Sequence, residues 1–326
     1  MKRALLFLVC VFPIQSSWGN DNHGLAVEYL NKMGNALYSL NYYGTLIYSH
    51  DNQIETMQLI HKVDADGEHE RLVHTSGAER EVVRKGDTVT CYLSDSQSVL
   101  VGKRRFNSHL LAKLRTDFTK FVDTYSFEAD GKDRVAGRIA RVILIKPKDS
   151  YRYGYRLWID EDSHLLLKSE LVDEKQQVLE QMMFANMDVV ANIADEMLKP
   201  AINGESYTWH EDKAKDPAAV PVDEGWRVGH LPSGFSVTGH FMQNMPNSKD
   251  PVEHMVISDG LASISVYIEN YNAKGKNFIG VSQMGAINIY GLLKDKYKIT
   301  VVGEVPAATV RMVADSVRHD AAGAGG

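Results

Sequence analysis

The spacing of hydrophobic residues changes shortly after residue 40. Between Asn22 and Leu40 the apolar residues recur at i, i+4, i+5, i+8 and i+12, which predicts an amphipathic helix packed on a sheet. Beyond this segment apolar and polar residues alternate, and β-branched and aromatic residues become frequent, which predicts sequential antiparallel strands joined by polar turns. The first expected strands are Tyr43–Tyr48, Thr56–Val63, Glu81–Arg84 and Thr88–Leu93.

Helical and alternating patterns follow each other again from residue 107 to residue 187. Helical spacing returns at Asn107–Leu114 and Asp117–Phe121, and both segments are expected to lie across the sheet. Alternation then resumes with polar turns between the runs, which predicts a long antiparallel meander. The strands expected here are Asp133–Lys146, Tyr151–Asp160, Leu165–Val172 and Val178–Met187.

A second, smaller domain is expected after a linker. The apolar pattern lapses over residues 206–222, where charges and prolines are typical of a linker. We therefore assign residues 20–205 to the N-terminal domain, 223–320 to the C-terminal domain and 321–326 to a flexible tail. The C-terminal elements expected are strands at Glu253–Ser258, Leu261–Glu269, Ser282–Tyr290 and Lys298–Gly303, then a helix that starts at Pro306.

The first residues are typical of a secretory signal peptide. Lys2 and Arg3 precede an apolar stretch from Ala4 to Ile14, and small residues then occupy the −3 and −1 positions before a cleavage site. The apolar stretch is shorter than the roughly 20 residues that a membrane-spanning helix needs. We therefore expect cleavage after Gly19, so that residues 1–19 are a signal peptide and the mature chain is exported.

The composition is that of an ordinary globular protein, with 44% hydrophobic and 24% charged residues. The formal net charge of −6 becomes more negative when Lys2 and Arg3 leave with the signal peptide. General attraction to nucleic acid is therefore not expected.

No common catalytic or cofactor signature that can be tested by spacing is present. The stretch His69–His74 resembles a zinc-protease motif, but three residues separate Glu70 from His74 where that motif has two. A nucleophile elbow, a phosphate-binding loop after a strand and a dinucleotide fingerprint are all lacking. We expect neither enzyme activity nor a bound metal or cofactor, and an envelope hydrolase with an unrecognised site is the catalytic alternative.

Cys91 is the only cysteine left after removal of the signal peptide, which excludes an intramolecular disulfide. Its place in the strand Val89–Leu93 favours a small buried hydrophobic residue. The alternative is a catalytic thiol, which would need a histidine nearby in space.

Two groups of residues favour lipid binding. The basic run of Lys103, Arg104 and Arg105 is a candidate for contact with the phosphates of a lipid or with an acidic peptide, and a solvated loop is the alternative. A tyrosine-rich strand face is either core packing under the helices or the wall of an apolar cavity. Its residues are Tyr151, Tyr153 and Tyr155, with Trp158 on the opposite parity.

Partner binding has two candidate residues in the second domain. Tyr267 and Tyr271 lie on or just after an expected strand, where each is an aromatic anchor for a partner or a core residue.

Five segments resemble a known family. They are Gly77–Gly86, Tyr151–Asp160, Leu231–Phe235, Ser258–Val266 and Val301–Pro306. In this order they resemble the MucB/RseB family of sigma-factor regulatory proteins, and the likeness covers nearly the whole mature chain.

The resemblance implies an α+β fold. Its larger N-terminal domain is a curved antiparallel sheet with helices on its concave side, similar to the periplasmic lipoprotein carriers of the LolA/LolB type. A smaller mixed α/β domain follows.

The resemblance also implies a periplasmic negative regulator of the envelope-stress response. Such a protein binds the periplasmic domain of a single-pass anti-sigma factor of the RseA/MucA type and shields it from site-one proteolysis. It releases the anti-sigma factor when lipid, lipopolysaccharide or mislocalised lipoprotein is sensed. A periplasmic lipid or lipoprotein carrier is the alternative function, and the residues leave open whether the chain forms a homo-oligomer.

Overall fold

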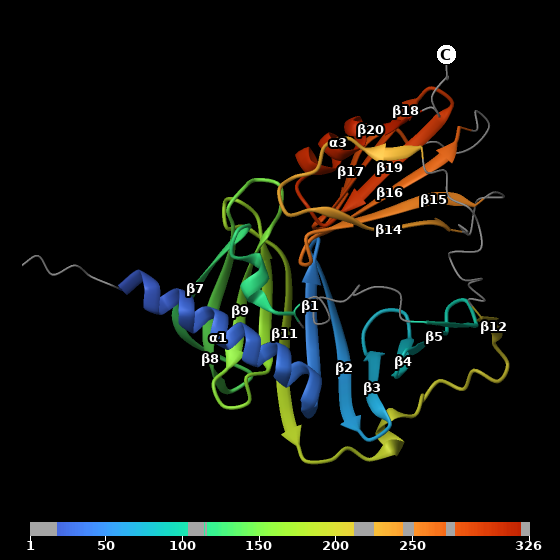
Figure 1. The fold of residues 1–326 in the computed structure, drawn as a ribbon. Coiled ribbons are helices and arrows are strands. Elements are labelled where there is room, and N and C mark those ends of the chain that lie inside the picture. The colour runs from blue at the N-terminus through green and yellow to red at the C-terminus, as the bar shows by residue number, and fades with distance from the viewer. Residues whose placement is uncertain are drawn as a thin grey trace, which may run out of the picture.

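The computed structural model contains two antiparallel sheets with one long helix on the first and a shorter helix on the second (Figure 1). It describes residues 18–103, 114, 116–211, 225–243, 251–271 and 278–320. No helix among these residues combines the length and the apolar character that crossing a membrane requires. The α+β fold predicted from the sequence, with a large curved sheet and a smaller second domain, is confirmed.

The N-terminal sheet has twelve strands in the order β12-β6-β5-β4-β3-β2-β1-β11-β10-β9-β8-β7. Neighbouring strands are antiparallel, except that β12 runs parallel to β6. The strands are β1 (Asn41–His50), β2 (Gln53–Asp64), β3 (Gly67–His74), β4 (Arg80–Lys85), β5 (Thr88–Leu93), β6 (Ser98–Lys103), β7 (Tyr125–Val135), β8 (Arg138–Pro147), β9 (Gly154–Asp160), β10 (Leu166–Val172), β11 (Val178–Val190) and β12 (Thr208–Glu211).

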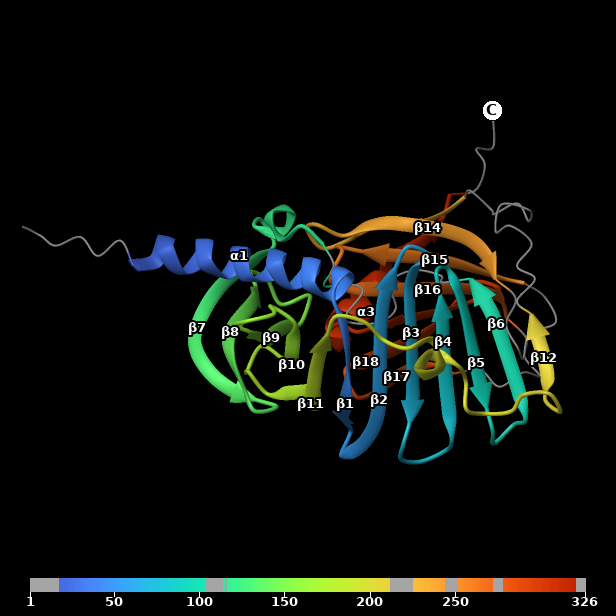
Figure 2. The ribbon, with the colours of Figure 1, turned by 90° about the horizontal axis from the view of Figure 1, so that it is seen from below.

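The helix α1 (Trp18–Ser39) crosses the half of this sheet formed by β7–β11, while β2–β6 extend beyond its end (Figure 2). Its apolar stripe of Ala26, Leu30, Met33 and Leu37 is almost completely buried. This stripe belongs to one core with sheet residues such as Phe127, Ile143 and Ile145. The amphipathic pattern therefore places the helix on the sheet as predicted. Residues 1–17, most of the predicted signal peptide, lie outside the described residues.

The segment between β11 and β12 packs on the other face of the sheet. The buried carboxylate of Glu81 pairs with Arg71 and accepts hydrogen bonds from the backbone N–H groups of Ala201 and Ile202, at 2.9 and 3.1 Å. A 3-10 turn, η2 (Asp195–Leu198), lies in the same segment.

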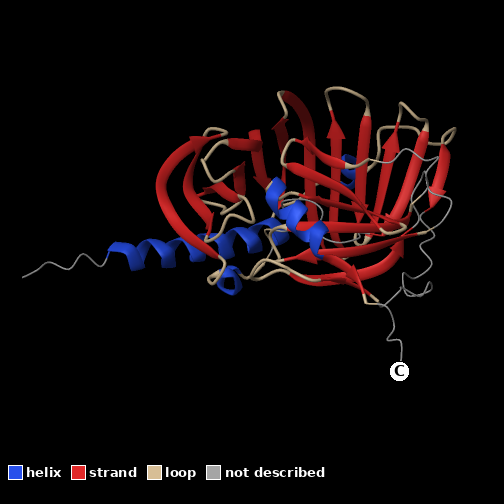
Figure 3. Cartoon of the chain, turned by 90° about the horizontal axis from the view of Figure 1, so that it is seen from above, coloured by secondary structure: helices blue, strands red, loops and turns tan. Residues whose placement is uncertain are grey.

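The C-terminal sheet has six strands in the order β14-β15-β16-β19-β18-β17. The helix α3 (Ala307–Ser316) packs on one of its faces (Figure 3). The strands are β14 (Ser236–Gln243), β15 (Val252–Ser258), β16 (Ser263–Asn270), β17 (Gly280–Met284), β18 (Ile287–Lys294) and β19 (Tyr297–Gly303), and a separate pair is formed by β13 (Trp226–Val228) and β20 (Val317–His319).

Two segments predicted as single strands are hairpins. The segment Asp133–Lys146 turns back at Ala136 and Gly137, whose φ angles are +50° and +76°. The segment Ser282–Tyr290 turns at Gly285, with φ +57°. A short turn without charged residues does not interrupt the apolar alternation, which is why the pattern concealed both.

Other differences concern segment ends and short elements. The predicted strand Tyr151–Asp160 starts only at Gly154, and the predicted helix Asp117–Phe121 is a single 3-10 turn, η1 (Phe118–Phe121). Thr208–Glu211, assigned to the linker, form the edge strand β12. The strands β6, β13, β14 and β20 were not predicted, and neither was β7 before Asp133. The predicted helix Asn107–Leu114 lies outside the described residues except for its last residue.

We predict that Gly44→Ala destabilises the N-terminal sheet. An added Cβ at Gly44 would lie 2.2 Å from the carbonyl oxygen of Asn186, next to the bulge that Ala185 forms in β11. Because backbone must then shift, the free energy of unfolding in urea should fall by about 1–3 kcal/mol. Gly24→Ala is the control, because nothing lies within 4 Å of its added Cβ and α1 should gain up to about 1 kcal/mol. Equal unfolding free energies for Gly44→Ala and the wild type would contradict the prediction.

Candidate functional site

One contact between the two sheets centres on Arg152, in the segment before β9. Its side chain is 0% exposed, and its guanidinium donates to Asp259 in the turn between β15 and β16 and to the carbonyl of Ser233, the latter at 2.6 Å. Asp149 accepts two further hydrogen bonds from Arg152, at 3.1 and 2.8 Å. The hydroxyl of Tyr125 on β7 donates to the same oxygen of Asp259 at 2.8 Å. We call this group the Arg152 contact.

Burial dominates the electrostatics of the Arg152 contact. Burial, followed by the charge of Asp259, raises the pKa of the Tyr125 hydroxyl well above its usual value, so the hydroxyl remains a donor. For Arg152, burial opposes the charge, but the hydrogen bond to Asp149 and the neighbouring Tyr125 and Asp259 outweigh burial and raise the pKa. The guanidinium carbon also lies 4.7 Å from the ring centre of Phe235, within cation–π distance.

Two glycines allow the C-terminal domain to approach this contact closely. Gly260 has φ +101°, and an added Cβ would lie 2.7 Å from a ring carbon of Phe121 in η1. Gly234 has φ +82°, and its added Cβ would lie 2.6 Å from Thr124. Both positions need a backbone conformation that favours glycine, and both lack space for a side chain.

A second contact between the domains lies at the turn between β17 and β18. The backbone N–H of Gly285 donates to Asp51 at 2.6 Å, and that of Ala286 donates to Glu180 at 3.3 Å. The other carboxylate oxygen of Glu180 accepts the hydroxyl proton of Tyr48 at 2.8 Å. Two carboxylates at the ends of β1 and β11 therefore hold this turn.

Side chains of the C-terminal domain also reach the segment before β9. The amide of Asn288 donates to the hydroxyl of Tyr153 at 3.0 Å, and the hydroxyl of Thr309 donates to the carbonyl of Tyr151 at 3.0 Å. The segment before β9 is therefore bonded to both β18 and α3.

An apolar strip crosses β2–β6 on the face of the sheet that carries α1. Its residues are neighbours in register, namely Leu59, Leu72, Val82, Cys91 and Leu100. Leu59, at the end near α1, is 2% exposed, whereas Leu100 on β6 is 42% exposed. Burial raises the pKa of the half-buried Cys91 thiol, which makes it a poor nucleophile at neutral pH. We call these five residues the apolar strip.

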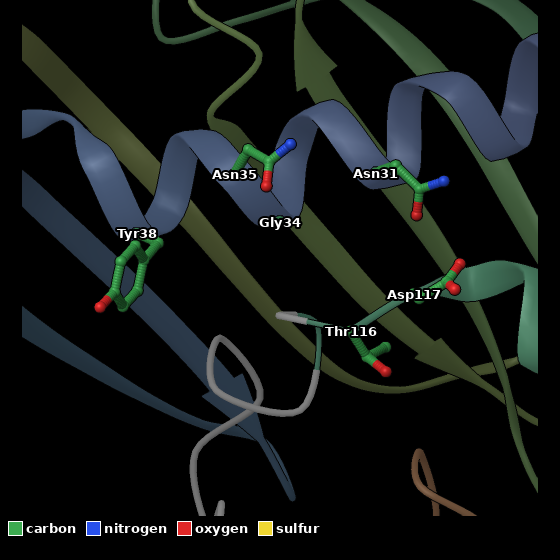
Figure 4. A pocket seen from close by; sticks show the side chains of 6 residues that line it. All are labelled: Asn31, Gly34, Asn35, Tyr38, Thr116 and Asp117. Carbon is green, nitrogen blue, oxygen red and sulfur yellow. The ribbon is translucent and has the colours of Figure 1, made fainter.

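A pocket of about 430 Å³ lies between α1 and the segment that leads into η1 (Figure 4). The Asn31 carboxamide accepts a hydrogen bond from the backbone N–H of Phe118 at 3.3 Å, and the Asp117 carboxylate caps η1 by accepting from Thr119. The pocket is lined by Asn31, Gly34, Asn35, Tyr38, Thr116 and Asp117.

The lipid-binding candidates divide into two groups. Lys103 ends β6 at the open end of the apolar strip, but its side chain, Arg104 and Arg105 lie outside the described residues. The core of the N-terminal domain contains the buried side chains of Tyr153, Tyr155 and Trp158, whereas Tyr151 is half-buried. None of these four residues lines the described pocket beside α1. Trp158 donates to Asp133 at 2.9 Å, and the ammonium of Lys168 lies 4.2 Å from its ring centre.

The partner-binding candidates lie on and after β16. Tyr267 stacks on His254 of β15 with ring centres 4.3 Å apart, and Phe241 of β14 meets His254 edge-on at 4.8 Å. His254 is 7% exposed, and neither of its ring nitrogens has a hydrogen-bond partner among the described residues. Tyr271 is 42% exposed, and its backbone N–H donates to the backbone carbonyl of Lys296 at 2.8 Å.

Sequence reasoning did not single out the Arg152 contact. Arg152, Ser233 and Asp259 are more than 20 residues apart from one another, so no local spacing joins them. All three lie within segments that carry the family resemblance, and this was the available signal. The stretch His69–His74 forms β3, and the described residues hold no group of three His, Cys, Asp or Glu side chains suited to a metal ion.

Comparison with known proteins finds relatives along the whole chain. The model of the MucB/RseB N-terminal domain matches residues 25–202, and that of the MucB/RseB C-terminal domain matches residues 221–318. The sigma factor AlgU regulatory protein MucB of Pseudomonas aeruginosa is 33% identical, with 98% of this chain and 97% of the relative covered. The sigma-E factor regulatory protein RseB of Escherichia coli K12 is 27% identical, with 90% of each covered.

Solved structures extend the likeness to the fold. The structure of the P. aeruginosa MucA/MucB complex matches with a TM-score of 0.72 and 32% identity, covering 91% of this chain and 99% of the matched chain. A crystal structure of MucB matches with a TM-score of 0.63 and 30% identity, covering 91% of this chain and 98% of that chain.

We predict that Arg152→Met strongly destabilises the protein. Methionine keeps an apolar stem but removes the positively charged partner of the buried Asp259 carboxylate and the donor to the Ser233 carbonyl. Removing one partner of a buried ion pair costs about 3–5 kcal/mol, measurable by urea denaturation. Lys146→Met is the control, because Lys146 and Glu128 form an exposed pair whose loss should cost less than about 1 kcal/mol. A loss for Arg152→Met no larger than that for the control would refute the prediction.

His254 gives a second prediction, a dependence of stability on pH. Burial lowers the pKa of His254 from 6.5 to about 4, so between these values the unfolded chain binds a proton that the folded chain does not. Stability should therefore fall as the pH falls through this window, by up to about 1.4 kcal/mol per unit for this one group. Thermal unfolding of His254→Phe should show a weaker pH dependence. No loss of stability is expected at pH 7, because the ring nitrogens have no hydrogen-bond partner in the described part of the chain.

The control for His254→Phe is His210→Gln, which changes an exposed histidine on β12 and should keep the wild-type pH dependence. If His254→Phe loses as much stability as the wild type between pH 7 and pH 5, His254 is not the responsible group.

Proposed function

This chain belongs to the MucB/RseB family, as five segments of its sequence predicted, and we propose that it is a periplasmic negative regulator of an envelope-stress sigma factor. It binds the periplasmic domain of a single-pass anti-sigma factor, shields that domain from site-one proteolysis and releases it when lipid, lipopolysaccharide or mislocalised lipoprotein is sensed. It works by binding and has no catalytic role.

The observation that carries this proposal is the likeness of both domains, in one chain, to MucB. The relatives are named as regulators of sigma factors, and MucB has been solved in complex with the periplasmic part of MucA. The identity of 32% and the TM-score of 0.71 to that MucB cover 91% of this chain. Both domains of MucB therefore have a counterpart in this chain.

The apolar strip supports a lipid as the effector. Its residues become more exposed from Leu59 to Leu100, so an acyl chain could lie along the strip and be removed from water there. Lys103 follows at the same edge, and with Arg104 and Arg105 it is proposed to meet the phosphate group. The same strip supports the alternative of a lipid or lipoprotein carrier.

Tyr267 and Tyr271 remain the proposed partner anchors. Tyr271 has the exposure that an anchor needs, whereas Tyr267 shares its ring face with His254.

Titration of the mature protein with the periplasmic segment of a MucA-like anti-sigma factor from the same organism tests the main proposal. We expect saturable binding at micromolar concentration or below, measured by calorimetry. Absence of binding at these concentrations would reject the proposal. Full lipid transfer by residues 20–205 alone would favour the carrier instead.

Cys91 provides a separate test of the lipid effector, because it belongs to the apolar strip and is the neighbour in register of the exposed Leu100. We expect dihexanoylphosphatidylglycerol to slow the reaction of the Cys91 thiol with a maleimide, since a bound acyl chain covers the thiol. Leu100→Glu should remove this protection because a carboxylate resists burial under an acyl chain. Ile139→Glu, an exposed apolar position on β8, is the matched control and should keep the protection. An unchanged reaction rate in the presence of the lipid would exclude the strip as its site.

A further inference from the structure

The 3-10 turn η1 lies between the pocket beside α1 and the interface of the two domains. At its start, Asp117 caps the turn and lines the pocket together with Thr116. At its end, Phe121 contacts Gly260 in the turn between β15 and β16. Only four residues, Phe118–Phe121, span the distance between these two sites.

The packing of η1 makes it a stiff connection. Phe118 is 0% exposed and Phe121 is 7% exposed, and their rings meet edge-on with centres 6.1 Å apart. Phe118 also packs edge-on against Phe127, at 6.0 Å. A close-packed element of this kind moves as a unit when one end is displaced, because its side chains have no free volume to absorb the change.

The ring of Phe121 touches two parts of the Arg152 contact and its surroundings. Its ring lies next to Gly260, where no room remains for even a methyl group, and Asp259 precedes that glycine. Its ring also meets Tyr125 edge-on at 6.4 Å, and the Tyr125 hydroxyl donates to Asp259. A shift of Phe121 therefore changes both the turn that carries Asp259 and one of the two side chains that hold Asp259 in place.

We propose that η1 is a positioning element that couples the pocket beside α1 to the domain interface. A ligand group that takes the space of Thr116 and Asp117 displaces η1, and Phe121 then loosens the turn Ser258–Ala262 from the Arg152 contact. This inference rests on the proposed function, because it supplies the step by which a ligand in the N-terminal domain alters a surface built from both domains. Such a ligand acts by binding the loosened arrangement more tightly than the bonded one.

A tethered probe tests the coupling without any knowledge of the natural ligand. Asn35→Cys is made in mature protein that carries Cys91→Ala, and the exposed new thiol is modified with pyrenylmaleimide, which places a rigid group in the pocket. Hydrogen exchange is then followed at the backbone N–H groups of Leu261 and Ala262, which donate to Asp259 at 2.9 and 2.7 Å. We expect their exchange to accelerate roughly five-fold or more on modification, the usual lower range of coupling between sites.

Two variants separate coupling through η1 from other effects. Glu28→Cys, modified with the same reagent, places the group on α1 outside the pocket and should leave exchange at Leu261 and Ala262 unchanged. Phe121→Leu in the Asn35→Cys protein removes the ring carbons that contact Gly260 and should abolish most of the acceleration of exchange. Asn31→Ala, which removes the acceptor for the Phe118 N–H, replaces Phe121→Leu if that variant does not fold.

Complete modification of Asn35→Cys without faster exchange would overturn the inference, and so would an equal acceleration in Phe121→Leu or in modified Glu28→Cys. No anti-sigma segment takes part in this experiment. Its failure therefore leaves the proposed function intact, and the failure of that function in the binding titration does not alter the exchange result.

Discussion

A buried arginine determines how the two halves of this molecule sit together. Moving a guanidinium out of water costs several kcal/mol, and the cost is offset only when its donors and the opposing charges are satisfied by good geometry. Arg152 finds one carboxylate, Asp149, in its own segment, but Asp259 and the Ser233 carbonyl come from the other domain. The domains must therefore meet in one arrangement for the charge to be tolerated, which makes the Arg152 contact a condition for the interface rather than an addition to it.

The remaining contacts of the interface join turns of the C-terminal domain to strand ends of the N-terminal domain. The C-terminal domain contributes mainly turns, with glycine at positions 234, 260 and 285, where backbone approaches the N-terminal domain closely. The N-terminal domain contributes strand ends and the segment before β9. Contacts between turns and strand ends leave sheet faces available, and the apolar strip on β2–β6 is such a face. The strip proposed to bind lipid and the interface between the domains therefore use different side chains of one sheet.

Much of the fold could be predicted from the sequence, because α1, β2 and β15 each carry a strong periodic pattern in which hydrophobic burial is the main force. The pattern failed where backbone geometry decides. Ala136, Gly137 and Gly285 reverse the chain inside segments of alternating apolar and polar residues, and β12 pairs with β6 through backbone hydrogen bonds that no side-chain pattern records. The candidate site was predicted less well. The tyrosines of Tyr151–Tyr155 were recognised for their rings, yet Arg152 between them carries the interface. Its hydrogen-bond acceptors other than Asp149 are more than 80 residues distant in the sequence.

Thermodynamic linkage connects the Arg152 contact to regulation. If a ligand in the N-terminal domain weakens partner binding by some factor, the partner must weaken ligand binding by the same factor. The carrier of that reciprocity has to be an element with two packed arrangements, since a ligand with equal affinity for both shifts nothing. In the coupling that we propose, the Arg152 contact is this element, bonded in one arrangement and open in the other. A buried ion pair is either fully bonded or, once opened, hydrated, and intermediate separations are unfavourable because each charge is then neither paired nor solvated. A small displacement at Phe121 can therefore decide between two domain arrangements instead of producing a graded distortion.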